Sequence, residues 1–294
     1  MSADEVLGLL QDLRVAERRG NALLELSKRR EQLPDLGPML WYTFGCVVGL
    51  IQEVLQVYPL LKNPSLLTSE ASNRVCNSLA LLQSIAAHPE TRLSFLKAHI
   101  PMLLYPLLNT SVYPCKDEGV AHTSRSFEYL RLTALGVLGA MVKVEEVEVI
   151  SFLVKSDDLL LLCLDIMQNG SELSRSLCVF ILQKILQDDK GLSYICATAK
   201  RFYSVSSALG KIVETHPWQQ SDSSTRLLKT VVKCYVRLAE NPRAREGLRK
   251  CLPDGLKALN DPTEAATLNP LARSADNIIK KLLAHLIRDL QYAG

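Results

Sequence analysis

The residue types that carry most acid–base and metal chemistry are few and scattered in this chain of 294 residues. Its five histidines stand at positions 88, 99, 122, 216 and 285, and no two have the i, i+4 spacing with which one helix face holds a metal ion. The sequence also lacks the GxSxG, GxxxxGKS/T and HExxH patterns of hydrolases, nucleotide-binding loops and zinc proteases. We therefore expect neither an enzyme nor a metal or cofactor site.

Two pairs of adjacent acids, Asp157-Asp158 and Asp188-Asp189, are the remaining candidates for catalytic carboxylates. Neighbouring residues on a helix point away from one another, so neither pair can converge on a substrate as a pair. Both pairs stand directly before apolar helical segments. We therefore predict that they cap these helices and complement the helix dipole.

The eight cysteines form no CxxC pair, and most stand inside apolar helical runs. Reduced thiols behave as small core residues in such runs, which we favour over a disulfide framework or a zinc site. The N-terminus lacks the basic start of a signal peptide. The longest uncharged run, residues 98–115, is interrupted by three prolines. These features predict a soluble intracellular protein without a membrane partner.

The elements that surround these residues read as repeated helices. The phrases "HPETRLSFLKAHIPMLLYPLL" at 88–108 and "NPRAREGLRKCLPDGLKAL" at 241–259 each follow a long apolar-striped helix and open a short helix with Pro. Segments 127–167 and 171–213 are more degenerate copies. Three helices per unit and a period of about 40 to 45 residues are typical of armadillo repeats, so we predict an all-α repeat solenoid of about six repeats.

The predicted organisation has a single repeat domain with extensions at both ends. Residues 1–19 form an N-terminal helix or extension, 20–268 the armadillo-repeat domain, and 269–294 a C-terminal capping helix. Early helices are expected at 20–32 and 38–57, an inserted loop at 109–126 and a linker at 216–224. An irregular all-α bundle remains the alternative architecture.

The clearest surface feature is basic. Arg226, Lys229, Lys233 and Arg237 recur at helical spacing opposite an apolar stripe, and four further cations follow, namely Arg243, Arg245, Arg249 and Lys250. With a net charge of only +3, any basic surface must be local. Such a face is either simply solvated or binds an acidic peptide or a nucleic-acid backbone.

A second candidate surface lies on the segment "FEYLRLTALGVLGAMVK". Tyr129 stands near its start, and Gly136 and Gly139 interrupt the helical pattern. Glycine inside a helix costs about 1 kcal/mol relative to alanine, so these positions need a reason. Close helix packing is one, and a shallow groove that accepts a partner peptide is the other.

Several segments together resemble one known family from about residue 20 to 260. They are "NALLELSKRRE", "LPDLGPMLW", "SNRVCNSLALLQSIAAHPETR", "FEYLRLTALGV", "FILQKIL", "GLSYICAT" and "NPRAREGLRKCLPD". The chain is similar in these to the Rcd or Caf-forty family, the armadillo-repeat subunit of the Ccr–Not deadenylase complex. The resemblance implies a non-catalytic adaptor, found in cytoplasm and nucleus, that binds the large Not scaffold and recruits regulatory or silencing proteins to control mRNA poly(A) shortening.

The resemblance also assigns roles to particular positions. It implies a scaffold-binding surface at Tyr42, Phe44, Val48 and Leu55, and a peptide groove at Tyr129, Gly136 and Leu177. It places Arg201 at a pocket for tryptophans of silencing proteins, although Ala199 stands where the family often has an aromatic residue. Direct nucleic-acid binding through the basic face at 226–250 is the alternative function, and homodimer formation stays open.

Overall fold

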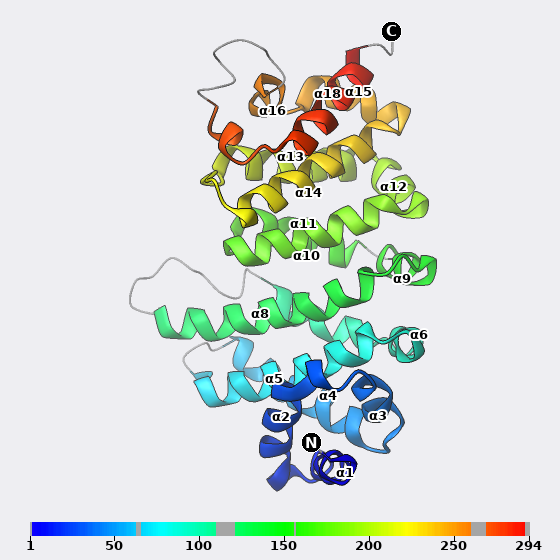
Figure 1. Ribbon diagram of the computed structural model, residues 1–294, viewed down its shortest axis with the longest axis vertical. Coiled ribbons are helices and arrows are strands. Elements are labelled where there is room, and N and C mark those ends of the chain that lie inside the picture. Colours follow the sequence, from blue (N-terminus) through cyan, green and yellow to red (C-terminus); the bar gives the residue numbers. More distant parts are fainter. Residues whose placement is uncertain (1, 63–65, 110–120, 156, 260–268, 292–294) are drawn as a thin grey trace. The chain divides into compact units, whose positions relative to one another are not determined.

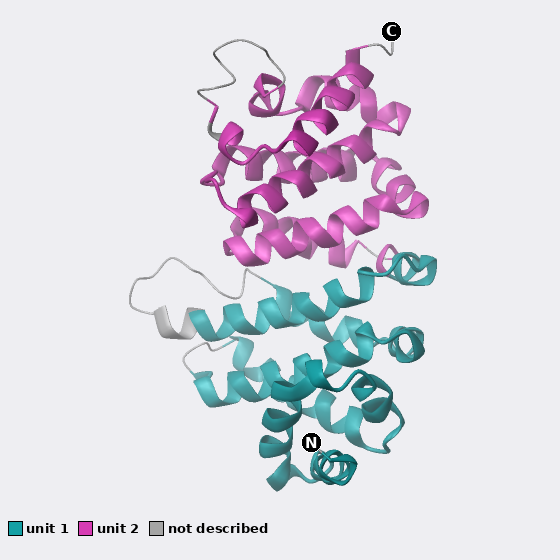
Figure 2. Cartoon of the chain, viewed as in Figure 1, with its two compact units in different colours: residues 1–152 teal, residues 153–294 magenta. Residues whose placement is uncertain are grey.

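The computed structural model describes residues 2–62, 66–109, 121–155, 157–259 and 269–291. Every regular element within these ranges is helical, and no strand occurs in them. The predicted all-α class, built of helical repeats, is therefore confirmed. The chain divides into two compact units, residues 1–152 and residues 153–294 (Figure 2).

Unit 1 is organised around α5 (Ser69–Ala87) (Figure 1). The buried residues of α5 include Val75, Leu79, Leu82 and Ile85 at helical spacing. The helices packed on α5 are α2 (Ala16–Arg29), α3 (Leu36–Tyr42), α4 (Cys46–Gln56), α6 (Pro89–Lys97) and α8 (Ala121–Val142). The remaining helices are α1 (Ala3–Asp12), which packs on α2, and α7 (Tyr105–Leu108) and α9 (Val147–Leu153). Short 3-10 turns occupy Arg30–Gln32, Tyr58–Lys62 and Ile100–Leu104.

Unit 2 is organised around α11 (Glu172–Gln187) and α14 (Asp222–Ala239), which pack on each other. The other helices are α10 (Asp158–Asn169), α12 (Asp189–Cys196), α13 (Ala199–Thr215), α15 (Pro242–Cys251), α16 (Asp254–Ala258) and α18 (Asn277–Gln291), with a 3-10 turn at Pro270–Arg273. Helix α18 covers α14 at the end of the array (Figure 1). The expected long–short–long helix order is thus present at 171–213.

An arginine side chain stabilises the turn between consecutive helices at several places in the chain. Before α6, His88 caps the helix, and four residues later Arg92 Nε donates to the carbonyl oxygen of Ala86 at 3.1 Å. The same six-residue spacing links Arg19 Nε to Leu13 O at 2.7 Å and Arg245 Nε to Ala239 O at 2.8 Å. The last carbonyls of a helix have no partner within it, so each guanidinium satisfies one of them and ties that helix to the helix that follows.

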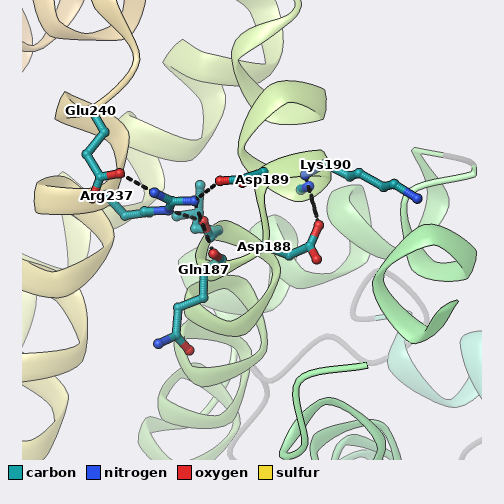
Figure 3. Close-up of polar contacts among 8 residues, drawn as sticks. Gln187, Asp188, Asp189, Lys190, Arg237 and Glu240 are labelled. Atoms are coloured by element: carbon teal, nitrogen blue, oxygen red, sulfur yellow. Dashed lines mark hydrogen bonds and ion pairs between the residues drawn. The ribbon is translucent and has the colours of Figure 1, made fainter. Parts of the chain in front are cut away.

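The turn between α11 and α12 lacks that arginine, because Leu192 stands at its position. Arg237 on α14 takes over the role: its Nε donates to Leu186 O at 2.9 Å and its Nη2 to Gln187 O at 3.1 Å (Figure 3). As predicted, Asp188 caps α12 through the backbone N–H groups of Lys190 and Gly191. The turn is thus completed by a side chain from the next repeat.

Three predicted boundaries are wrong. The single helix expected at 38–57 is two helices, because Gly45 adopts a left-handed backbone conformation (φ 86°) between α3 and α4. The loop expected at 109–126 ends early, since α8 begins at Ala121; residues 110–120 lie outside the described residues. The linker expected at 216–224 ends where α14 begins at Asp222.

The described cysteines are free thiols in buried or half-buried positions: Cys46, Cys76, Cys163, Cys178, Cys196, Cys234 and Cys251. Burial raises the pKa of Cys46 and of Cys196 to about 11, so both are protonated at neutral pH. Cys115 lies outside the described residues. In the part of the chain that the structure describes, no single helix is long and apolar enough to cross a membrane, and α3 with residues 46–62 meets that test only as a pair bent by 92°.

Candidate functional site

The most prominent surface of unit 1 is apolar and covers α3, α4 and the turn between them. We call it the α3–α4 surface. Its exposed side chains are Met39 (41% exposed), Tyr42 (64%), Phe44 (84%), Val48 (58%) and Leu55 (40%). Isolated exposed apolar residues are common on proteins, whereas a group of this size within one helical corner is typical of interaction sites.

Local sequence explains why these side chains face outward. Helix α3 buries Leu36 and Leu40, and α4 buries Cys46, Leu50 and Val54. Both helices pack against α5, and Cys46 also contacts Leu10 O of α1, so the remaining faces are left to solvent. The turn at Gly45 ends α3 and turns the chain into α4, which leaves Phe44 at the corner.

All four residues predicted for scaffold binding lie on the α3–α4 surface. Val48 and Leu55 are seven residues apart on α4 and therefore share one helix face. Met39 was missed, although it stands three residues before Tyr42, at helical spacing. A neighbouring cation, Arg14, was also missed, because it comes from the segment between α1 and α2.

The residues predicted for the peptide groove are divided between the units. Tyr129 is 54% exposed on α8, and Gly136 is seven residues further along the same helix face. A Cβ built at Gly136 would lie 3.5 Å from Gln83 Oε1 on α5, an ordinary contact distance. Close packing therefore does not require glycine here. Leu177 is half-buried on α11 in unit 2.

Arg201, predicted at a tryptophan pocket, is engaged within unit 2. Its Nε is 2.9 Å from Asp157 Oδ1, and its guanidinium lies over the Tyr194 ring, 4.2 Å from the centroid. The Tyr194 hydroxyl also donates to Asp157. Burial and then Asp157 raise the pKa of Tyr194 to about 12. The predicted N-capping role of Asp157 is wrong, because its carboxylate makes no capping bond to α10.

A pocket of about 260 Å³ opens beside this cluster. Its lining residues are Cys196, Ala197, Thr198, Ala199, Phe202, Tyr203, Arg243, Ala244 and Gly247. The two aromatic side chains come from α13 and the guanidinium from α15. Ala199 contributes no aromatic ring to the lining, whereas Tyr203, four residues on, contributes one and is 47% exposed.

The predicted basic face is smaller than its sequence suggests. Arg226 and Lys233 are exposed on α14 and Lys229 is half-buried there. Arg237 is instead a structural residue, bound to the end of α11 and paired with Asp189 and Glu240 (Figure 3). Arg245 and Arg249 also donate to backbone carbonyls, those of Ala239 and Leu290.

His216 comes closest to a catalytic arrangement, with Nε2 3.2 Å from Ser224 Oγ and 3.9 Å from Glu172 Oε1. Both partners face the same ring nitrogen, whereas a triad places the acid on the other nitrogen. His216 and Ser224 are buried, and burial lowers the pKa of His216. These contacts hold the start of α14. Among the described residues, no group of three or more His, Cys, Asp or Glu side chains could bind a metal ion.

The fold and the α3–α4 surface define the chain as a helical-repeat protein with an exposed apolar surface on unit 1. A solved crystal structure of an engineered protein shares the fold, with a TM-score of 0.61 and 15% identity over 100% of this chain and 98% of that one. The chain belongs to the cell differentiation family, Rcd1-like, whose family model matches residues 9–290. This confirms the resemblance seen in the sequence.

Two relatives are similar over most of the chain. Cell differentiation protein rcd1 of Schizosaccharomyces pombe is 52% identical over 273 residues, 92% of this chain and 88% of that protein. Protein CAF40 of Saccharomyces cerevisiae is 48% identical over 240 residues, 82% of this chain and 61% of that protein. The α3–α4 surface and the pocket on unit 2 both lie within the residues that the family model matches.

Proposed function

We propose that this protein is a non-catalytic adaptor subunit of the Ccr–Not deadenylase complex, acting in cytoplasm and nucleus. Membership of the Rcd1-like family and similarity to rcd1 and CAF40 support a Ccr–Not subunit role in general. On this proposal the protein binds the large Not scaffold and recruits regulatory proteins through short peptides, so that partner nucleases shorten poly(A) tails.

The α3–α4 surface is the observation that carries the scaffold assignment. Tyr42, Phe44 and Val48 are each more than half exposed, which is unusual for large apolar side chains of a protein that acts alone. Aromatic side chains are enriched at the centres of protein interfaces. Covering this surface with a partner removes that apolar area from water.

The test is capture of the protein by a Not-scaffold fragment. We expect wild type to be retained and Tyr42→Asp/Phe44→Asp to be lost, because a buried carboxylate without a partner is costly at an interface. Leu161→Asp/Ile278→Asp, which introduces two carboxylates at exposed apolar positions of unit 2, is the matched control and should still be retained. Equal capture of the double variant and wild type would contradict the assignment of the α3–α4 surface as the scaffold-binding site.

The pocket on unit 2 and the α8 face are the proposed sites for regulatory peptides. The pocket combines two aromatic side chains with Arg243, a composition suited to an aromatic anchor residue. We expect tryptophan-containing peptides to protect Tyr203 from solvent in hydrogen-exchange or fluorescence measurements. The purified protein should leave poly(A) RNA intact.

A second candidate function is nucleic-acid binding through α14. Arg226, Lys229 and Lys233 make no ion pair within the described residues, so their charges are available to phosphates. Such binding should weaken steeply with salt and with Lys229→Glu/Lys233→Glu. A flat salt response would eliminate this function.

A further inference from the structure

Arg14 lies at the edge of the α3–α4 surface, beside its most exposed aromatic ring. The guanidinium carbon is 5.8 Å from the centroid of Phe44, within the range of a cation–π interaction. Phe44 is 84% exposed, and Arg14 is exposed as well. A cation and an open aromatic ring from two separate segments thus form one continuous surface.

The backbone of the α3–α4 turn holds Arg14 in this position. A Cβ built at Gly45 would lie 3.4 Å from Arg14 Nε and 3.5 Å from its Cγ, so the arginine stem packs directly over the glycine. The aliphatic part of the side chain covers the turn while the charged end stays in water. A side chain already held by packing loses less conformational entropy when a partner binds.

Arg14 has no ion-pair partner among the described residues. The acid nearest in sequence, Asp12, is taken by Arg18 at 2.8 Å. The Glu90 carboxylate interacts with the Tyr42 hydroxyl. The α3–α4 surface therefore carries a cation that is held in position by packing and that forms no ion pair among the described residues.

We propose that Arg14 recognises an acidic side chain on the segment that docks on the α3–α4 surface. The partner that fits is an amphipathic helix whose apolar face covers Phe44 and Val48 and whose Asp or Glu meets Arg14. This inference rests on the proposed function and adds the charge that the scaffold segment must carry. Apolar area supplies most of the affinity, whereas the charge pair sets the register and the rate of association.

The experiment measures the affinity of a Not-scaffold fragment by calorimetry for wild type, Arg14→Gln, Arg14→Glu and Lys143→Glu. We expect binding to weaken roughly two- to fivefold for Arg14→Gln and about tenfold or more for Arg14→Glu, where two carboxylates repel. Lys143 is an exposed cation after the end of α8, so Lys143→Glu makes the same charge change in unit 1 and should bind as wild type does. Circular dichroism melts establish that each variant is folded.

A charge exchange identifies the acid on the partner. Changing each acidic residue of the fragment to Arg in turn should yield one fragment that binds Arg14→Glu more tightly than it binds wild type. Affinity for wild type should fall more steeply with salt than affinity for Arg14→Gln, since one ion pair is absent in the variant.

The outcomes separate this inference from the proposed function. If Arg14→Glu binds the Not-scaffold fragment as tightly as wild type does, while Tyr42→Asp/Phe44→Asp does not bind it, the role of Arg14 is overturned. The assignment of the docking surface is then kept. Normal binding by both variants overturns the surface and the inference together. A dimer in sedimentation that Phe44→Asp dissociates would assign the surface to a second copy of the chain and also overturn the inference.

Discussion

Arg19 on α2 and Glu53 on α4 form an ion pair of 3.2 Å in which the side chains are 6% and 2% exposed. Arg74 on α5 donates to the same carboxylate at 3.0 and 2.8 Å. Burial alone would raise the pKa of Glu53, but the hydrogen bonds and charges of Arg74 and Arg19 outweigh burial and hold that pKa below its ordinary value of 4.5. One carboxylate therefore joins three helices of unit 1.

Removing this charge should destabilise unit 1. Glu53→Gln leaves Arg19 buried without its partner, and we expect a loss of about 3–5 kcal/mol in the free energy of unfolding at neutral pH, measured by urea denaturation. Because the folded-state pKa is lowered, the stability from Glu53 is complete above pH 4.5 and declines as pH falls below it. The variant should lack this decline, so parallel pH curves for the two proteins would contradict the prediction.

Arg237 should stabilise unit 2 far more than other cations of α14. Arg237→Ala leaves the carbonyls of Leu186 and Gln187 without their donor, and we expect unfolding to become easier by about 1–3 kcal/mol in thermal or urea melts. Arg226→Ala, an exposed cation on the same helix, should change stability by less than about 0.5 kcal/mol. Arg237→Lys should not restore the loss, because lysine lacks the planar fork that reaches both carbonyls.

Two glycines should respond in opposite ways to alanine. A Cβ at Gly191 would lie 1.9 Å from Ile185 O, so Gly191→Ala must displace backbone in the α11–α12 turn and should cost about 1–3 kcal/mol. At Gly136 the nearest atom is a side-chain oxygen at 3.5 Å, and Gly136→Ala should stabilise α8 by up to about 1 kcal/mol. Equal effects of the two changes on the melting temperature would contradict this reading.

The effect of Asp157 on the pKa of Tyr194 can be measured by ultraviolet absorbance. Asp157→Asn should lower the pKa of Tyr194 from about 12, because the carboxylate charge that disfavours the phenolate is removed. Burial remains, so the pKa should stay above the ordinary value of 10. Difference ultraviolet titration of variant against wild type measures the shift. Asp158→Asn removes an acid that acts only through its charge, and it should shift the pKa less.

Sequence patterns predicted the repeat architecture because its signals are local. Apolar periodicity, Pro at the first helical position and the capping acid Asp188 act within a few residues, and the structure confirms each of them. The recurring arginine was visible as a pattern, in Arg92 and Arg245, but its purpose was not. Each arginine donates a hydrogen bond to the carbonyl oxygen six residues earlier. This contact crosses a turn, and the geometry of that turn is known only from the folded structure.

The rest could not be predicted because it depends on contacts distant in sequence. Asp157 looked like a helix cap, yet residues 37 and 44 positions later engage it. Arg237 looked like part of a basic face until the end of α11 was placed beside it. Arg14 carried no signal at all, since its relation to Phe44 exists only through the fold. Tyr42, Phe44, Val48 and Leu55 were assigned from a family resemblance, whereas Met39, three residues before Tyr42 on the same helix, was missed.

Arg237, which binds the end of α11 at the α11–α12 turn, is synthesised 51 residues after Leu186, whose carbonyl oxygen it binds. During translation, the turns before α2 and α6 emerge with their own guanidinium and can close at once. The turn at Asp188 must wait until α14 has left the ribosome. We therefore expect this turn of unit 2 to be completed late in synthesis, and a chain that ends before Arg237 to be cleaved more readily at this turn.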